Sequence, residues 1–224
     1  MKPLSEITPA ELDSLKVVTF DVDGVIIPMG TDVRENESGT EFYMKTHKLS
    51  KKFVDTLLEL KKYVRINFSS GRSMLYLRSL VTDVFDDTII LQSDNGSMTW
   101  IDGKITHPAF SHIFYKKIND VRLGIRSLRE KGAHIRSFEP KMFIVTVHSD
   151  EMKEIPELIK NIDPEGDLYC VRGSEAYDIG MKGINKGHAI GELAKYLGIL
   201  DKQIMTTGNY RNDAEMLRAG LGVT

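Results

Sequence analysis

The stretch "VVTFDVDGVII", from Val17 to Ile27, decides the fold of this chain. It opens with a continuous apolar run, Val17 to Phe20, of the kind that forms a short strand buried on both faces of a parallel sheet. The run then stops at Asp21 and Asp23, two residues of poor strand propensity whose carboxylates resist burial. Two carboxylates at one end of a buried strand indicate that this edge of the sheet holds something cationic.

The passage from an apolar strand to a polar turn and then to a helix recurs along the chain. Strands are predicted over residues 64–72 and 88–96, and helices over 50–63 and 73–85. The pattern resumes over 186–224 with a helix, a strand, a helix and a final strand. Such repeats are typical of parallel strands joined by right-handed crossovers, and ligands bind beyond the carboxyl ends of those strands. The sequence therefore predicts an α/β fold with a Rossmann-like parallel sheet core.

Between these two parts of the chain the pattern changes. The predicted elements are a hairpin over 97–107, a long helix over 109–132, a strand over 141–149, a helix over 151–162 and more strand over 167–181. This order is typical of a small α+β domain inserted into the core. We expect a discontinuous core over 1–106 and 180–224, and an inserted α+β domain over 107–179.

The composition limits the kinds of partner that the chain can bind. Of its 224 residues 41% are hydrophobic and 28% are charged, and the formal net charge is -2. This balance provides no basic field for nucleic acid or for an acidic membrane surface, so an anionic substrate has to be held locally. The single cysteine, Cys170, excludes an internal disulfide. The polar amino end, together with the lack of an apolar run long enough to span a bilayer, predicts a cytoplasmic location.

Four of the predicted strand ends carry residues that can do chemistry. They are "DVDG" at 21–24, "SSGR" at 69–72, "NKG" at 185–187 and "GNYRND" at 208–213. In this order they resemble the motifs of the haloacid dehalogenase-like (HAD) phosphohydrolase superfamily. The "SDNGS" turn at 93–97 and the place of the insert are similar to the Cof-type branch, whose α+β cap domain is of the type called C2B. The resemblance covers nearly the whole chain.

Residue chemistry and the resemblance together assign roles to the first two motifs. A carboxylate can act as a covalent nucleophile in phosphoryl transfer, and we assign this role to Asp21. The resemblance implies that Asp23 protonates the leaving group, then deprotonates water, and offers its backbone carbonyl to the metal ion. It also implies that Ser70 binds the phosphoryl group, with the backbone N–H groups of Gly71 and Arg72 beside it at a helix start.

The last two motifs supply positive charge and further ligands. Lys186 is expected to neutralise Asp21 and the phosphoryl oxygens as a compact point charge, and Asn212 to take part in phosphate binding. Mg²⁺ prefers hard oxygen ligands. The resemblance implies the following Mg²⁺ ligands: Asp21, Asp23, Asn209 and Asp213. The superfamily usually has an aspartate where this chain has Asn209, so one negative charge is missing and weaker metal binding is expected.

Two further features depart from the superfamily pattern. The connection over 28–48 is longer than the usual short flap, and its polar composition predicts a mobile loop. The chain stops at "GLGVT" (220–224), where related proteins continue, which indicates either an abbreviated core or a shortened chain.

The sequence thus predicts an Mg²⁺-dependent phosphatase that hydrolyses a small phosphorylated metabolite, with sugar phosphates as the expected class, through an aspartyl-phosphate. Two alternatives stay open: a phosphomutase similar to phosphomannomutase, and a catalytically impaired binding or regulatory protein, which Asn209 suggests. The expected partners are the phosphorylated substrate and, as an option, a second copy of the chain in a homodimer, but neither nucleic acid nor a membrane. Candidate substrate contacts in the inserted domain are His134, Arg136, Glu139, Lys141 and Arg172.

Overall fold

The computed structural model describes residues 1–36, 38–173 and 175–223. The chain divides into two compact units. The first unit comprises Met1–Gly30, His47–His107 and Ile184–Thr224, and the second comprises Thr31–Thr46 and Pro108–Gly183. The second unit thus includes residues 31–46 as well as 108–183. We predicted an inserted domain over 107–179 and assigned residues 31–46 to the core.

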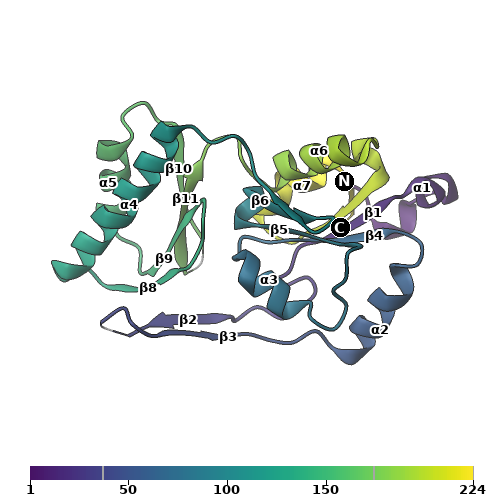
Figure 1. The fold of residues 1–224 in the computed structure, drawn as a ribbon, viewed down its shortest axis with the longest axis horizontal. Helices are drawn as coiled ribbons and strands as arrows, with labels where there is room; N and C mark the ends of the chain where they lie inside the picture. Colours follow the sequence, from purple (N-terminus) through teal and green to yellow (C-terminus); the bar gives the residue numbers. More distant parts are fainter. Residues whose placement is uncertain (37, 174, 224) are drawn as a thin grey trace. The chain divides into compact units, whose positions relative to one another are not determined.

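The first unit is built on a seven-stranded sheet with the order β13-β12-β1-β4-β5-β6-β7 (Figure 1). Its strands are β1 (Val17–Phe20), β4 (Arg65–Ser69), β5 (Ile89–Ser93), β6 (Met98–Ile101), β7 (Lys104–Thr106), β12 (Ile204–Thr207) and β13 (Leu221–Val223). The strands from β13 to β5 in this order are parallel, and β6 and β7 add an antiparallel hairpin at one edge. The predicted α/β class with a parallel sheet is confirmed.

Helices cover both faces of this sheet, with α2 and α3 on one side and α6 and α7 on the other (Figure 1). The helices of the first unit are α1 (Pro9–Ser14), α2 (Lys51–Leu60), α3 (Met74–Leu80), α6 (Lys186–Leu197) and α7 (Ala214–Ala219). Short 3-10 turns are η1 (Leu4–Glu6), η2 (Asp94–Gly96), η3 (Asp201–Gln203) and η4 (Arg211–Asp213). Side-chain caps fix where helices begin: Ser50 accepts from the Phe53 N–H at the start of α2, and Asn185 from the His188 N–H at the start of α6.

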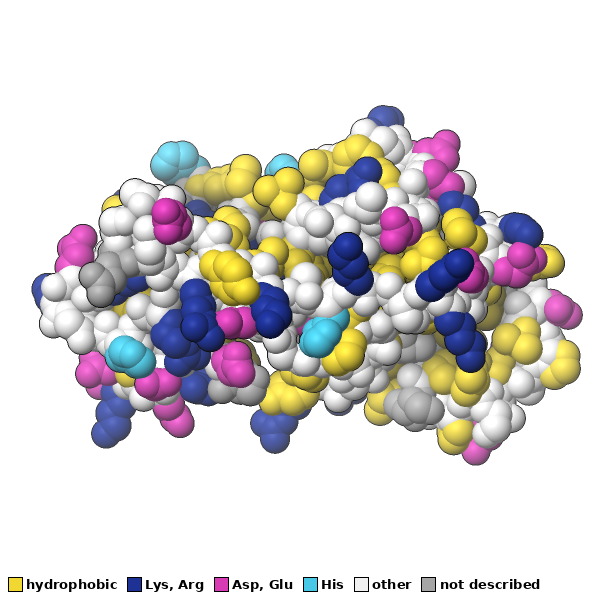
Figure 2. All heavy atoms as spheres, turned by 90° about the horizontal axis from the view of Figure 1, so that it is seen from below, with side chains coloured by type: hydrophobic (Ala, Val, Ile, Leu, Met, Phe, Trp, Pro, Cys, Tyr) yellow, Lys and Arg dark blue, Asp and Glu magenta, His cyan; other side chains and the backbone are white. Residues whose placement is uncertain are grey.

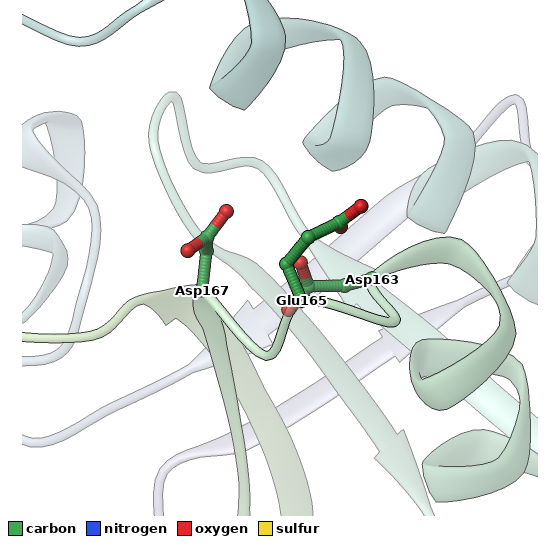
Figure 3. A group of neighbouring side chains, drawn as sticks. All are labelled: Asp163, Glu165 and Asp167. Atoms are coloured by element: carbon green, nitrogen blue, oxygen red, sulfur yellow. The ribbon is translucent and has the colours of Figure 1, made fainter.

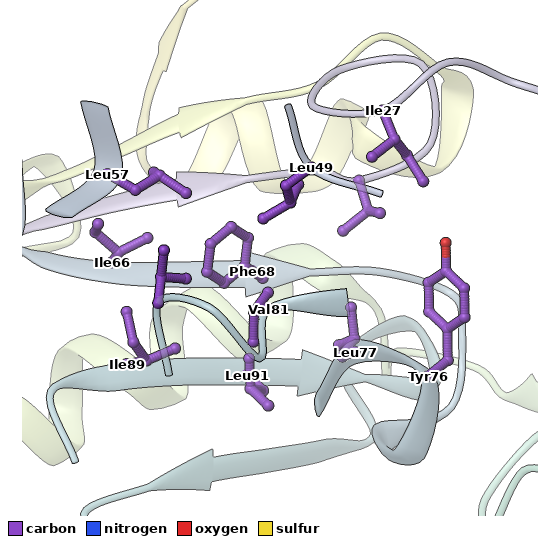
Figure 4. Packing of buried hydrophobic residues seen from close by; sticks show 12 residues of the cluster. Ile27, Leu49, Leu57, Ile66, Phe68, Tyr76, Leu77, Val81, Ile89 and Leu91 are labelled. Carbon is purple, nitrogen blue, oxygen red and sulfur yellow. The ribbon is translucent and has the colours of Figure 1, made fainter. Parts of the chain in front are cut away.

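The larger hydrophobic core lies between the sheet and helices α2 and α3. Figure 4 shows Phe68 of β4 among Leu57, Leu77 and Leu91, which are all buried. Leu57 comes from α2, Leu77 from α3 and Leu91 from β5, so their burial packs the helices of two crossovers against the sheet. Each such side chain contributes roughly 1.5–3 kcal/mol when it leaves water.

A row of buried polar side chains crosses the middle of the sheet. Asn67 of β4 donates from Nδ2 to Thr19 Oγ1 of β1 at 3.1 Å and to Gln92 Oε1 of β5 at 2.8 Å. Gln92 in turn donates from Nε2 to the carbonyl oxygen of Ala189 in α6 at 2.8 Å. Because these polar groups are buried and bonded to one another, the row fixes α6 relative to the strands it covers.

The second unit contains a four-stranded antiparallel sheet with the order β10-β11-β9-β8 and two helices that lie side by side on it (Figure 1). Its elements are α4 (His112–Glu130), β8 (Ile135–Glu139), β9 (Val145–Ser149), α5 (Glu154–Ile162), β10 (Leu168–Arg172) and β11 (Ala176–Met181). The α+β character agrees with the prediction. The segment predicted as strand over 167–181 forms the two strands β10 and β11. Strand β8 was not predicted, because its alternating Arg136, Ser137 and Glu139 give no apolar period.

The prediction that residues 28–48 form a mobile loop is wrong for two parts of this segment, residues 32–35 and 42–45. Residues Asp32–Glu35 and Phe42–Lys45 form the antiparallel strands β2 and β3. Ser137 Oγ of β8 donates to the carbonyl oxygen of Val33 at 2.9 Å, and Arg129 of α4 pairs with Glu35 at 2.8 Å. These contacts attach the hairpin to β8 and α4. The sequence did not reveal it because Val33 is the only buried residue in either strand.

The surface of the chain shows no dominant charge on the side drawn in Figure 2, where acidic and basic side chains are interspersed with hydrophobic ones. This distribution agrees with the net charge of -2. Within the three described segments, no helix combines the length and apolar character needed to cross a membrane.

An ion-pair cluster joins α4 to the turn between α5 and β10. Three carboxylates of that turn, Asp163, Glu165 and Asp167, lie close enough together to hold a metal ion (Figure 3). The Lys117 ammonium already binds all three, at 2.5 Å from Asp163, 2.9 Å from Glu165 and 2.8 Å from Asp167. The cluster is therefore a structural link in which a lysine supplies the positive charge.

Replacing Lys117 by Met should lower the melting temperature most strongly at neutral pH. Burial raises the pKa of Asp163, but hydrogen bonds from Lys117 and from backbone N–H groups outweigh burial, so this pKa lies below its ordinary value. Lys117 also lowers the pKa of Glu165. Carboxyl groups with lowered pKa values stabilise the folded chain above their ordinary pKa, and that stabilisation is lost as the pH falls through the folded pKa. The difference between wild type and Lys117→Met should therefore shrink below about pH 4.

The measurement is the melting temperature of wild type and of Lys117→Met, taken from neutral pH down to below about pH 4. Lys116→Met is the matched control, because Lys116 is exposed and has one exposed partner, Asp120. A difference that stays constant with pH would contradict the account of the cluster.

Candidate active site

The predicted site residues follow strands that end at the same edge of the sheet. Phe20, the last residue of β1, lies beside Phe68 of β4 and Thr207 of β12 in the register. Asp21 directly follows Phe20, and Ser70 comes two residues after Phe68. The backbone N–H of Asp21 donates to the Thr207 carbonyl oxygen at 3.0 Å. All of the core residues assigned from the sequence therefore lie in the first unit, at the carboxyl ends of parallel strands.

At the centre of this edge a buried lysine joins two aspartates. Lys186 Nζ donates to Asp21 Oδ1 at 2.5 Å and to Asp213 Oδ1 at 2.6 Å. Lys186 is 1% exposed, Asp213 is 0% exposed and Asp21 is 6% exposed. A lysine this deeply buried is retained only where its charge is compensated, and here two carboxylates compensate it.

The charges of this cluster are strongly interdependent. Burial by itself lowers the pKa of Lys186, but the two carboxylates outweigh burial, and the pKa lies above its ordinary value. Burial raises the pKa of Asp21, and the Lys186 ammonium opposes that rise. Lys186 therefore stays protonated, and it is the group that lets two carboxylates share a nearly dry site.

Asp213 holds a loop as well as the lysine. Its Oδ2 accepts from the backbone N–H groups of Asn209 and Tyr210, both at 3.0 Å. The Asn209 side chain is oriented by this loop so that Nδ2 lies 3.4 Å from the carbonyl oxygen of Asp23. The fourth motif thus lies against the first. Asn212 is also in this segment, in η4, where it is exposed.

Asp23 pairs with an arginine of the second motif. Arg72 Nε lies 3.2 Å from Asp23 Oδ2, and Arg72 Nη2 lies 3.5 Å from Asp23 Oδ1. Both side chains are about four-fifths buried, at 18% and 20% exposed. We had considered only the backbone of Arg72, so the sequence analysis missed this contact of its side chain, for which the spacing along the chain gives no signal.

The second motif is bent back on itself rather than placed at a helix start. Helix α3 begins at Met74 and is capped by Ser73, so Gly71 and Arg72 precede it. The Arg72 N–H donates to Ser70 Oγ at 3.1 Å. The expectation that these N–H groups lie at a helix start is therefore wrong, because Ser73 rather than an earlier residue caps the helix. The role of Ser70, Gly71 and Arg72 in phosphate binding stays a prediction.

A tight turn after β5 positions both the second motif and α6. Asp94, Asn95 and Gly96 have φ values of 53°, 53° and 89°, which an Asn-Gly pair adopts readily. The N–H groups of Asn95 and Asp94 donate to the carbonyl oxygens of Ser70 at 3.1 Å and Arg72 at 3.0 Å. A Cβ on Gly96 would lie 2.6 Å from the carbonyl oxygen of Asn185, next to Lys186.

The candidate substrate contacts of the second unit are engaged within that unit. His134 and Arg136 both pair with Asp150, at 2.9 Å and 2.8 Å. Glu139 pairs with Lys141 at 2.8 Å and with His148 at 2.9 Å, and Arg172 donates to the Gly173 carbonyl oxygen at 2.6 Å. Their assignment to substrate binding stays a prediction.

The fold is of the α/β class, and a buried lysine lies between two aspartates at the carboxyl edge of its parallel sheet. A family model described as haloacid dehalogenase-like hydrolase matches residues 129–224. The matched segment covers the end of the second unit, the Lys186 motif and the Asp213 motif. The motifs at Asp21 and Ser70 lie outside the matched segment but follow the superfamily order.

Two sequence relatives are phosphoglycolate phosphatases. One, from Methanopyrus kandleri, is 26% identical over 179 residues, which cover 77% of this chain and 74% of the relative. The other, from Methanoculleus marisnigri, is 25% identical over 224 residues, covering 93% of this chain and 83% of the relative. The names of both relatives agree with the hydrolase family whose model matches residues 129–224.

Solved structures share the fold. A trehalose-6-phosphate phosphatase related protein has a TM-score of 0.66 at 18% sequence identity. The matched region covers 92% of this chain and 85% of that protein's chain. A HAD superfamily phosphatase from Bacteroides thetaiotaomicron has a TM-score of 0.62 at 18% identity, covering 96% and 85%.

The superfamily generally requires a divalent metal ion, and the donors at this edge fit one. The Asp21 carboxylate, the Asp23 carbonyl oxygen and the Asn209 amide are gathered at the strand ends, and the last two are adjacent at 3.4 Å. Rotation of the amide by half a turn would present Oδ1 instead of Nδ2, so that Asn209 would offer an oxygen donor. Carboxylate, carbonyl and carboxamide oxygens are all hard donors. The acidic cluster around Lys117 belongs to the other unit and is separate from this set.

Replacing Gly96 by Ala should reduce the rate of phosphate release while leaving KM nearly unchanged. The added Cβ would meet the Asn185 carbonyl oxygen at 2.6 Å and the Ala189 Cβ at 2.8 Å, so the start of α6 has to move and Lys186 moves with it. A displacement of this size at a charged group costs about 100-fold in kcat.

Gly103→Ala is the matched control for this variant. Gly103 also has a positive φ, 74°, but a Cβ there would meet nothing within 4 Å. Steady-state kinetics that respond equally to both substitutions would show that backbone strain, rather than displacement of Lys186, is responsible.

Proposed function

We propose that this HAD-like phosphatase is Mg²⁺-dependent and hydrolyses a small phosphorylated metabolite through an aspartyl-phosphate on Asp21. The observation that carries the proposal is the contact of the buried Lys186 ammonium with Asp21, at 2.5 Å. A carboxylate nucleophile has to approach a negatively charged phosphoryl group, and a fixed positive charge beside it reduces their repulsion. Lys186 is placed to supply that charge.

The reaction has two balanced steps. In the first, an oxygen of Asp21 forms a bond to phosphorus while the bond to the leaving oxygen breaks, and Asp23 gives that oxygen a proton. In the second, water attacks the phosphorus, Asp23 takes a proton from it, and the bond to Asp21 breaks to release inorganic phosphate. One residue can serve both steps because the carboxylate left after Asp23 has given up its proton can then accept a proton from water.

The proposal gives the surrounding residues supporting roles. Arg72 orients the Asp23 carboxylate through the contact at 3.2 Å, and Ser70 binds a phosphoryl oxygen. We assign Asp213 to holding Lys186 and the loop at Asn209, since both of its oxygens accept hydrogen bonds from these groups. This differs from its predicted role as a direct metal ligand.

The metal ion would be held by the Asp21 carboxylate, the Asp23 carbonyl oxygen and Asn209. When bound, it supplies charge neutralisation for the phosphoryl oxygens. Asn209 contributes no charge, so the affinity for Mg²⁺ is expected to be lower than with an aspartate at this position.

The substrate class is narrowed by the relatives. The two sequence relatives are named phosphoglycolate phosphatases, which makes 2-phosphoglycolate the first compound to test, and sugar phosphates the second. A phosphomutase would use the same two aspartates but would need a bisphosphorylated activator, which separates it from a hydrolase.

A second candidate function is a binding or regulatory protein without turnover. It is favoured by the hydrogen bond that Asn209 makes to the Asp23 carbonyl at 3.4 Å, in place of a charged ligand. The buried Lys186 argues against it, because burying one ammonium and two carboxylates costs several kcal/mol per ion and has no structural purpose that apolar residues could not serve.

Release of phosphate from an aryl phosphate and from 2-phosphoglycolate, measured against Mg²⁺ concentration, tests the proposal. Asp21→Asn should reduce turnover to background, because the amide cannot act as a nucleophile. Asn209→Asp should lower the Mg²⁺ concentration for half-maximal rate by about tenfold, since one added charge near the ion contributes on the order of 1–4 kcal/mol.

Two variants with the same chemical changes at exposed positions serve as controls, Asp83→Asn and Asn161→Asp. No turnover by wild type, with turnover in Asn209→Asp, would favour the binding protein. Full activity in a folded Asp21→Asn would overturn the aspartyl-phosphate.

A further inference from the structure

Strand β3 presents an exposed edge with three large apolar residues. Phe42, Tyr43 and Met44 are 41%, 54% and 37% exposed, and Lys45 is exposed as well. Within the described part of the chain, β3 pairs with β2 alone, so its other edge has no strand beside it. An apolar strand edge left open is a template for pairing with another chain, and proteins usually protect it.

The hairpin register shows which backbone groups of β3 lie on the open edge. The N–H of Asn36 donates to the carbonyl oxygen of Glu41 at 3.1 Å, so Glu41 faces β2. In an antiparallel ladder this direction alternates, so that Tyr43 and Lys45 also face β2. The N–H and carbonyl groups of Phe42 and Met44 therefore point to the open edge.

We propose that a second copy of this chain pairs with this edge, β3 against β3 in antiparallel orientation, around a two-fold axis at Tyr43. In this register Phe42 lies opposite Met44 of the second copy, and the two residues exchange both backbone hydrogen bonds. Tyr43 lies opposite Tyr43. The result is a continuous four-stranded sheet formed by the two hairpins.

The same register places opposite charges together. Glu41 lies two residues before Tyr43 and Lys45 two residues after it, so each Glu41 is opposite a Lys45 of the second copy. These are non-hydrogen-bonded pairs, in which the Cα atoms approach to about 4.5 Å and the side chains are closest. Neither residue has an ion pair with another described residue of its own chain. A strand whose charges match only when it pairs with itself favours a second copy over an unrelated partner.

The attachment of the hairpin supports this inference. The contacts of Val33 with Ser137 and of Glu35 with Arg129 hold β2 against β8 and α4. Because β3 is already a strand paired with β2, its backbone loses little conformational entropy when a second copy binds. The paired strands are only four residues long, which gives an interface below the standard size and a weak dimer whose population depends on concentration.

Sedimentation equilibrium over a range of concentrations tests the charge register. Glu41→Lys and Lys45→Glu should each weaken the dimer by at least about tenfold, since like charges would then face each other. The double variant Glu41→Lys/Lys45→Glu should restore it, because the opposite pairs are regenerated. Lys160→Glu changes the charge equally at an exposed position of α5 and should have no effect.

Cysteine cross-linking tests the position of the two-fold axis. In a Cys170→Ser background, Tyr43→Cys should form a covalent dimer on mild oxidation, because the two cysteines face each other. Phe42→Cys should not, since its counterpart is displaced by two residues and lies beyond the roughly 7 Å limit for a disulfide. The proposal is overturned if wild type stays monomeric at all concentrations, if the single charge variants dimerise like wild type, or if Phe42→Cys cross-links as readily as Tyr43→Cys.

Discussion

The first unit depends on one buried interaction, the contact of Lys186 with Asp21 and Asp213. Three charged groups leave water here, and their mutual attraction repays this only when the geometry is held closely. Much of the neighbouring structure does so. Gln92 fixes α6 to the sheet through the Ala189 carbonyl oxygen, and Gly187 lets α7 approach, since a Cβ there would lie 2.7 Å from the backbone of Glu215. The glycine that follows the lysine is thus needed to bring Asp213 to it.

This constraint also explains how the site could be recognised in the sequence. A parallel sheet places the carboxyl ends of its strands at one edge, and the short motifs at Asp21, Ser70 and Lys186 each follow an apolar run that is recognisable locally. The fold class and the gathering of these residues could therefore be predicted. Asn209 is recognisable in the sequence because the superfamily motif usually has an aspartate at this position. The structure adds that the Asn209 side chain lies against the carbonyl oxygen of Asp23.

Other parts of the structure depend on contacts between residues that are distant along the chain, and no local pattern predicts such contacts. The pairing of Arg72 with Asp23 joins residues 49 apart, and the link from Lys117 to Asp163 joins residues 46 apart. In the strands β2 and β3 only Val33 is buried, so no alternation of apolar and polar residues predicts these two strands. Such elements are stabilised by tertiary contacts rather than by the propensity of their own residues.

The most direct test of the central claim is to find where the phosphoryl group resides during turnover. Mass spectrometry of the Asp23→Asn variant, quenched in acid shortly after mixing with an aryl phosphate, should show one phosphoryl group on the peptide that contains Asp21. The aryl leaving group departs without a proton, so loss of Asp23 slows the second step, which needs a general base, more than the first. A phosphoryl group on another residue, or release of phosphate in a burst with none retained on the chain, would contradict the account that Lys186 prepares Asp21 as the nucleophile.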